Sequence, residues 1–183
     1  MKVIGYVASP RPMGNTVTLV SEVLRGAVSA GATVEICHLN GLSIRPCQAC
    51  DSCKQAGACR VVDDMASQYE ALRQADAVVL GTPIYWWGPS AQLKAFFDRW
   101  YAVEHLRTMQ GKDLLLVCTF GDSDPSTARF TVGMFETSAR HLGMRFQPPV
   151  TVSTPDRASA AANSAAVAEA FRAGTLLVEG RRP

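Results

Sequence analysis

The spacing of apolar residues along the chain predicts strands that alternate with helices. Short, nearly continuous apolar runs are typical of strands buried on both faces of a parallel sheet, whereas apolar side chains three and four positions apart indicate amphipathic helices. The predicted strands lie at 3–8, 33–39, 77–82, 114–119 and, more weakly because two prolines interrupt it, 145–152. The helical patterns lie at 17–30, 64–74, 90–101, 124–141 and 158–173.

Residues that favour helix ends agree with these boundaries. Asp63 or Asp64, Ser90 and Asp124 can cap the second, third and fourth helices, and Gly31 can end the first. Alternating strands and helices predict an α/β fold, in which helices cover both faces of a parallel sheet and the crossovers are right-handed.

Chain length and composition predict one domain. At 183 residues and 48% hydrophobic residues, the chain can bury a full core, and no repeat or linker divides it. We therefore expect a single domain over residues 1–183, with the segment at about 40–62 inserted as a long loop. Loops of that length in a small domain usually have a function.

The distribution of charge and the length of the apolar segments indicate which kinds of partner the protein binds. The net charge is +2, with acidic and basic residues mixed along the chain, so binding to nucleic acid or to an anionic membrane is not indicated. The apolar N-terminal run is too short for a signal peptide, and no apolar stretch approaches the roughly 18 residues of a membrane span. We expect a cytoplasmic protein, in which clustered cysteines bind a metal or are redox-active.

The loop after the first predicted strand suits a phosphate group. Ligands of open parallel sheets bind outside the carboxyl ends of the strands. This loop lacks the GxGxxG and P-loop patterns, but its hydroxyls, amide and guanidinium, with the free amides of the next helix, suit a phosphate dianion. An ordinary helix cap with an incidental arginine is the alternative. The candidate residues are Ser9, Arg11, Met13, Gly14, Asn15 and Thr16.

The loops after the third and fourth strands can surround a planar ring. Adjacent aromatic residues cannot all face one core, so at least one is available to line a ring pocket; core packing or a dimer contact is the alternative. In the loop after the fourth strand, Gly121 permits a ligand to approach the backbone amides closely. Together the three loops predict an FMN site. The candidate residues here are Pro83, Ile84, Tyr85, Trp86, Trp87, Gly88, Thr119, Phe120, Gly121 and Asp122.

Four closely spaced cysteines in the inserted segment suit thiolate ligation. The first three are separated by two residues each and the fourth follows after five, so they can hold one [4Fe-4S] cluster; zinc and thiols without a metal are the alternatives. Two further cysteines, Cys37 and Cys118, fall within predicted strands and are expected to be buried thiols. The candidate ligands are Cys47, Cys50, Cys53 and Cys59.

Several motifs, in a characteristic order, resemble a known family. They are Ser9-x-Arg11-x-x-Gly14-Asn15-Thr16, Asp63-Asp64-Met65, Ala75-Asp76, Pro83-Ile84-Tyr85 and Leu93-Lys94-x-Phe96-x-Asp98-Arg99. From residue 3 to about 145 the chain resembles the flavodoxin-fold, NADPH-dependent FMN reductase family, and its four cysteines resemble the motif of the iron-sulfur flavoprotein branch. The resemblance implies a three-layer sandwich with five parallel strands in the order 2-1-3-4-5, FMN held by the three loops, and a homodimer or homotetramer.

The same resemblance implies an FMN-dependent NAD(P)H oxidoreductase. Hydride would pass from the nicotinamide to flavin N5, and the electrons then to a quinone, a nitroaromatic, free flavin, oxygen, the iron-sulfur cluster or a redox protein. No catalytic side chain is expected, because the flavin carries the chemistry. The alternatives are an FMN electron carrier supplied by a ferredoxin-like partner, and an interaction protein that senses redox state or metals through its thiols.

The resemblance also bears on the helix that carries Lys94 and Asp98-Arg99. It implies that this helix lies at a subunit contact near the flavin. The alternative is an exposed ion pair four residues apart, which contributes about 0.3 to 0.5 kcal/mol.

Overall fold

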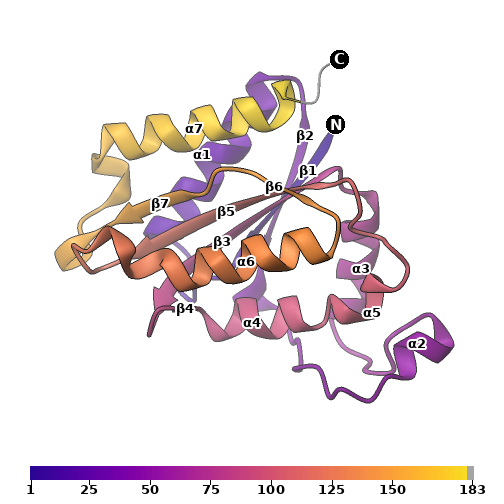
Figure 1. The fold of residues 1–183 in the computed structure, drawn as a ribbon. Helices are drawn as coiled ribbons and strands as arrows, with labels where there is room; N and C mark the ends of the chain where they lie inside the picture. Colours follow the sequence, from indigo (N-terminus) through magenta and orange to yellow (C-terminus); the bar gives the residue numbers. More distant parts are fainter. Residues whose placement is uncertain (181–183) are drawn as a thin grey trace.

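A parallel sheet with five strand positions lies at the centre of the computed structural model, which describes residues 1–180 apart from the Arg157 side chain. The positions are, in order, β2 (Thr33–His38), β1 (Lys2–Val7), β3 (Ala77–Tyr85), β5 (Asp113–Phe120) and an edge shared by β6 (Arg145–Phe146) and β7 (Val150–Ser153) (Figure 1). The short strand β4 (Gly88–Pro89) lies outside this row, and β6 and β7 count as one position, so the positions follow the expected order 2-1-3-4-5 of the flavodoxin-like topology. Residues 181–183, the end of the single domain expected over 1–183, lie outside the described part.

The strand register brings the ends of three strands to one edge of the sheet. Val7, the last residue of β1, lies opposite Gly81 of β3, and Pro83 of β3 lies opposite Thr119 of β5. Because all three strands run in the same direction, the loops that follow them begin side by side.

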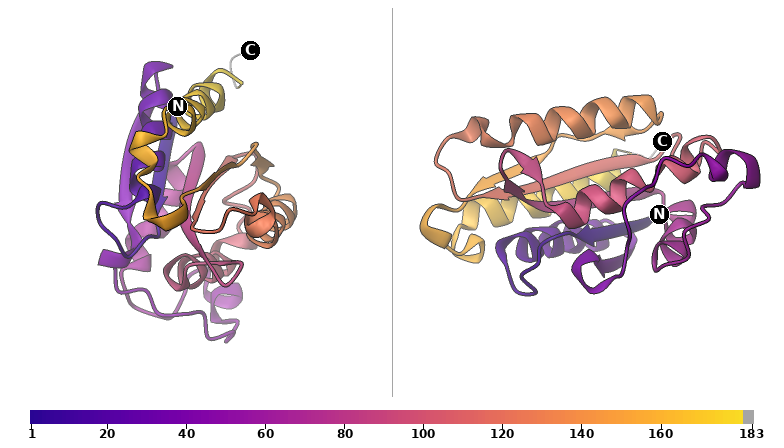
Figure 2. Two further views of the ribbon diagram at one scale, coloured as in Figure 1. Left: turned by 90° about the vertical axis from the view of Figure 1, so that its left-hand side faces the viewer. Right: turned by 90° about the horizontal axis from the view of Figure 1, so that it is seen from below.

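Alternate residues of the central strands face two separate cores, because successive side chains of a strand point to opposite faces. Ile4 and Tyr6 lie in one core, and Val3 and Val7 in the other. The first core is covered by α3 (Met65–Gln74), α4 (Ala91–Asp98) and α6 (Arg129–His141), and the second by α1 (Asn15–Ser29) and α7 (Ser164–Glu179). Figure 2 shows the resulting three layers, which confirm the expected sandwich.

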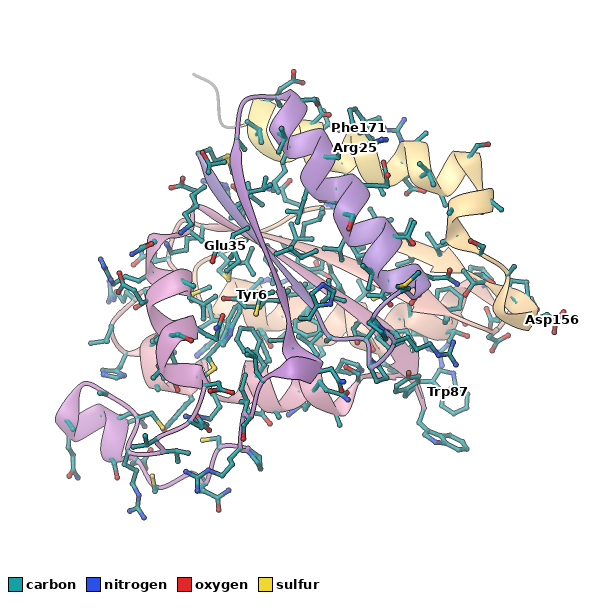
Figure 3. All side chains as sticks on the ribbon, turned by 180° about the vertical axis from the view of Figure 1, so that it is seen from behind. Tyr6, Arg25, Glu35, Trp87, Asp156 and Phe171 are labelled. Carbon is teal, nitrogen blue, oxygen red and sulfur yellow. The ribbon has the colours of Figure 1, made fainter. Side chains whose placement is uncertain are left out.

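Two glycines allow α1 and α7 to approach closely. A Cβ atom at Gly26 would lie 1.9 Å from the carbonyl oxygen of Phe171, and one at Gly174 would lie 1.8 Å from that of Val23. Neither position has room for another residue unless the helix backbones move apart. Figure 3 shows Arg25 of α1 beside Phe171 of α7, and the guanidinium lies 5.3 Å from the centre of the ring.

Several element boundaries differ from the predicted ones. The strand expected at 145–152 is divided into β6 and β7, and the helix expected at 124–141 begins at Arg129 after a turn of 3-10 helix. β3 continues to Tyr85 and pairs with a short antiparallel strand, β4 (Gly88–Pro89), instead of ending at residue 82. The pattern at 90–101 forms two helices, α4 and α5 (Tyr101–Glu104), because the N–H groups of Arg99 and Trp100 bond to carbonyls three residues back. The last helix begins at Ser164, where Asn163 caps it, and not at 158.

Short helices account for much of the remaining chain. Within the segment expected as a loop at 40–62, residues Ser52–Ala56 form α2. Turns of 3-10 helix lie at Leu39–Gly41, Pro125–Ala128, Pro155–Arg157 and Ala160–Ala162. The predicted caps Ser90 and Asp124 accept hydrogen bonds from Leu93 N and Ser126 N, and Asp63 accepts one from Met65 N at the start of α3. None of the helices in residues 1–180 is long and apolar enough to cross a bilayer.

Candidate functional site

A cavity of about 280 Å³ opens at the carboxyl ends of β1, β3 and β5. It brings together residues from all three loops that the sequence singled out. They are Ser9, Arg11, Gly14, Asn15, Thr16, Pro83, Ile84, Tyr85, Thr119, Phe120 and Gly121. The other candidates, Met13, Trp86, Trp87, Gly88 and Asp122, are not among the residues that line it.

The end of the cavity next to α1 has the groups that bind an anion. Within residues 1–180, no side chain caps the N-terminus of α1, and its first turn contains no acidic residue, so its backbone amides and helix dipole favour a negative charge. The hydroxyls of Ser9 and Thr16 are buried there, and Arg11 lies in the wall. A Cβ atom at Gly14 would lie 3.1 Å from Arg11 Cβ, so a larger residue would crowd this turn.

Three hydrogen bonds fix the neighbouring walls of the cavity. The hydroxyl oxygens of Thr16 and Thr119 lie 2.8 Å apart and connect the start of α1 to the end of β5. The side chain of Asn15 donates to the carbonyl of Ala158 at 2.8 Å and accepts from Ala160 N at 2.9 Å. The Asn15 amide, which the sequence suggested as a phosphate contact, therefore holds the segment after β7 in place.

The aromatic candidates occupy a tight hairpin between β3 and β4. Its two central residues, Trp86 and Trp87, have φ angles of 51° and 61°, a left-handed conformation that is costly for any residue with a Cβ atom. Thr131 Oγ1 donates to the carbonyl of Trp87 at 3.0 Å and ties the turn to α6. Trp86 is 90% exposed. Both tryptophans are exposed and follow Tyr85, which lines the cavity. Figure 3 shows Trp87 at the same end of the molecule as Asp156.

The structure adds two lining residues that sequence reasoning missed, Thr154 and Asp156. Both follow β7, and Thr154 is buried with its hydroxyl donating to the carbonyl of Phe120. Their position in the chain could have identified them as lining residues. The fifth predicted strand also ends at this edge of the sheet, so the loop that follows it reaches the same cavity as the loops after the first, third and fourth strands.

The four clustered cysteines line a second, much smaller cavity of about 20 Å³. Burial raises the pKa of Cys53, and the thiols of Cys59 and Cys47 raise it further. Within residues 1–180, no three His, Cys, Asp or Glu side chains form a ligand set for one metal ion. Gly57, with a φ angle of 71°, ends α2 and provides the bend expected between the last two cysteines. The segment lies beyond α3 and α5 in Figure 1.

A buried ion pair joins the two ends of this segment. Arg99 is 1% exposed and the Asp63 side chain 4%. The guanidinium donates to both Asp63 oxygens, at 2.7 and 3.2 Å, and to the carbonyls of Arg45 and Val61. Burial alone would raise the pKa of Asp63, but hydrogen bonds from Arg99, Arg45 N and Met65 N lower it overall. Both ends of the cysteine segment are therefore anchored to one side chain of the core.

The remaining chemical candidates lie outside both cavities. Cys118 is buried, as expected, and burial raises its pKa to about 12; Cys37 is only partly buried at the edge of the same core. Lys94 and Asp98 form an exposed pair at 2.7 Å.

Comparison with known proteins identifies relatives over most of the chain. Residues 1–158 match the sequence model of a family described as NADPH-dependent FMN reductase. An iron-sulfur flavoprotein of Methanocaldococcus jannaschii is 42% identical over 99 residues, which are 54% of this chain and 51% of that protein. The chain thus spans about half the length of the iron-sulfur flavoproteins it matches.

Solved structures share the fold. An NAD(P)H:quinone oxidoreductase from Methanothermobacter marburgensis superposes with a TM-score of 0.78 at 19% identity, over 97% of this chain and 96% of that one. A flavodoxin from the domain Archaea gives a TM-score of 0.64 at 17% identity, over 98% of both chains. These similarities support the flavodoxin-like architecture described above.

Proposed function

The chain belongs to the NADPH-dependent FMN reductase family, and from this premise we propose that the cavity at the strand ends holds FMN for the oxidation of NAD(P)H. The observation that carries the proposal is the cavity itself, where an anion-binding helix terminus and a partly apolar wall meet at the edge of the sheet. When bound, FMN supplies hydride acceptance from NAD(P)H and electron transfer to an acceptor.

Different residues of the cavity suit different parts of the cofactor. The amides at the start of α1, the Ser9 and Thr16 hydroxyls and the Arg11 guanidinium would bind the phosphate, since a dianion accepts many hydrogen bonds. Ile84, Tyr85 and Phe120 offer apolar surface to the flavin ring. Trp86 and Trp87, which are exposed and follow Tyr85, can cover the ring or a planar substrate after FMN is bound.

We also propose that the four clustered cysteines hold one [4Fe-4S] cluster. Four thiols that line one cavity are the donor set such a cluster requires. A buried guanidinium in the same wall, with one N–H group that lacks a partner among residues 1–180, suits an anionic ligand. The cavity between the thiols has room for about one water molecule, so binding a cluster requires the segment to move outward.

Anaerobic purification followed by absorbance, FMN, iron and sulfide assays tests both proposals. We expect FMN together with iron and acid-labile sulfide, and loss of the flavin absorbance on addition of NADPH or NADH. Flavin that stays yellow with both nucleotides but is bleached by dithionite would indicate an electron carrier. Absence of flavin would indicate a thiol-based sensor, and flavin without iron or sulfide would remove only the cluster.

Replacing Arg11 by alanine should weaken FMN binding. The variant loses a charge-assisted hydrogen bond, which corresponds to about 1.5 to 3 kcal/mol, or roughly 10- to 150-fold in the dissociation constant. Titration of apoprotein with FMN, followed by flavin fluorescence, measures the change. Arg73→Ala is the control, because Arg73 pairs with Glu70 on the surface of α3, outside the cavity. Equal affinities of Arg11→Ala and wild type would contradict the assigned role.

A further inference from the structure

The segment that follows β7 supplies one wall of the cavity at the strand ends, and its first residue is well fixed. Thr154 is buried, and its backbone N–H and its hydroxyl both donate to the carbonyl of Phe120, at 2.7 and 3.2 Å. Asp156, which also lines the cavity, has a φ angle of 51°, a left-handed conformation that is unfavourable for a residue with a Cβ atom. The wall beyond Thr154 therefore needs contacts from elsewhere in the chain to keep its shape.

Asn15, the first residue of α1, provides those contacts. Its side chain donates to the Ala158 carbonyl at 2.8 Å and accepts from Ala160 N at 2.9 Å, so both of its polar atoms are occupied. In the part of the chain that the structure describes, the other hydrogen bonds of the backbone at 155–160 stay within residues 155–163. The Asn15 side chain thus joins this wall to the turn at the start of α1.

The backbone and the side chain of Asn15 have different tasks. Its backbone N–H belongs to the first turn of α1, where amides have no partner within the helix and are proposed above to bind the phosphate. Its side chain could bind the same phosphate only by giving up the bonds to Ala158 and Ala160. A ligand at the start of α1 and the wall at 154–160 therefore meet at one residue.

Asp156 indicates which part of the cofactor this wall faces. A carboxylate repels a phosphate dianion but accepts hydrogen bonds from hydroxyl groups. FMN carries such hydroxyl groups on its ribityl chain, and riboflavin has the same chain without the phosphate. The wall therefore suits the ribityl chain, and damage to the wall should weaken the binding of FMN and of riboflavin equally.

We propose that Asn15 is a positioning residue for the flavin. By holding residues 154–160 against the start of α1, its side chain keeps Thr154 and Asp156 in the cavity wall and slows the release of bound flavin. It does so without a contact to the phosphate. The proposal rests on the FMN site proposed above.

The test compares two ligands that differ only in the phosphate. Apoprotein is titrated with FMN and with riboflavin, followed by flavin fluorescence. We expect Asn15→Ala to raise both dissociation constants about tenfold, the effect of one or two ordinary hydrogen bonds, so their ratio stays as in wild type. The helix itself should persist, because the Asn15 side chain does not cap α1 and alanine favours helices. Arg11→Ala should instead weaken the binding of FMN more than that of riboflavin.

Asn163→Ala is the matched control. It makes the same chemical change just after the wall and removes one hydrogen bond, which Ala166 N donates to the cap of α7 at 3.1 Å. Asn163 does not line the cavity. This variant should therefore lose some stability at the start of α7 and keep the wild-type dissociation constants for both flavins.

Amide hydrogen exchange is a second measurement, and it needs no substitution. In wild-type protein both flavins should slow exchange over residues 156–160, including the Ala160 N–H that donates to Asn15. A loss of affinity for FMN alone in Asn15→Ala would make this side chain a phosphate contact and overturn the proposal. Unchanged affinities, or exchange that neither flavin slows, would overturn it while FMN binding stands. Wild-type protein that binds neither flavin overturns the proposed function and this role together.

Discussion

Gly26→Ala and Gly174→Ala are each expected to lower the free energy of unfolding by about 3 kcal/mol, the upper end of the range for overpacked cores. The added Cβ atoms would lie 1.9 and 1.8 Å from backbone carbonyl oxygens of the opposite helix. No rotamer relieves such a contact, because neither a Cβ atom nor a carbonyl can turn away. The helices must separate, and the core between α1, α7 and the sheet loosens.

Urea unfolding followed by circular dichroism measures this loss, and the chain provides a control of the opposite sign. Gly133 lies in the exposed face of α6, with no atom within 4 Å of a Cβ placed there. Gly133→Ala should therefore stabilise the protein by about 0.5 to 1 kcal/mol, as alanine does inside a helix. Stability unchanged at both Gly26 and Gly174 would show that the two helices do not pack as closely as described.

Asp63→Ala is expected to cost about 3 to 5 kcal/mol, because it leaves the Arg99 guanidinium buried without its counter-charge. Part of the lost stability should be confined to the cysteine segment. With Asp63 removed, the bond to Arg45 N also disappears, so amide hydrogen exchange should accelerate across residues 45–63. The exposed pair of Lys94 and Asp98 is the control, and Asp98→Ala should cost no more than about 0.5 kcal/mol. Similar losses from the two substitutions would contradict a special role of the buried pair.

Acid provides an independent check on the same carboxylate. The pKa of Asp63 is lowered in the folded protein, so its contribution to stability is present above the unfolded value of about 3.9 and is lost as pH falls through the folded value. The Asp63→Asn variant lacks this pH-dependent contribution to stability. The difference in unfolding free energy between wild type and Asp63→Asn should therefore shrink as the pH falls below about 4.

The sequence was sufficient for the elements whose cause is local or periodic. Strands β1, β3 and β5 were recognisable because burial on both faces leaves continuous apolar runs. Ser90 and Asp124 cap their helices as their positions predicted. The order of the strands followed from the family resemblance, and the register of β1, β3 and β5 then places the three loops together.

What could not be predicted depends on partners distant in the sequence. Trp86-Trp87 is not a sequence that favours a two-residue hairpin, in which asparagine and glycine are usual; Thr131 and the pairing of Tyr85 with Gly88 hold it. The alanine-rich stretch from 158 has high helix propensity, yet Asn15 binds its first backbone groups and delays the helix to Ser164. Propensity is a weak predictor where a tertiary hydrogen bond competes with it.

The bond between Asn15 and Ala160 has a consequence for how the protein is made. It joins residues 145 positions apart, and the cavity wall likewise combines Ser9 with Asp156. Chains emerge from the ribosome N-terminus first, so the nascent protein displays the turn proposed to bind the phosphate long before the opposite wall exists. FMN should therefore be acquired only near the end of synthesis, and chains stalled before residue 160 should be released without cofactor.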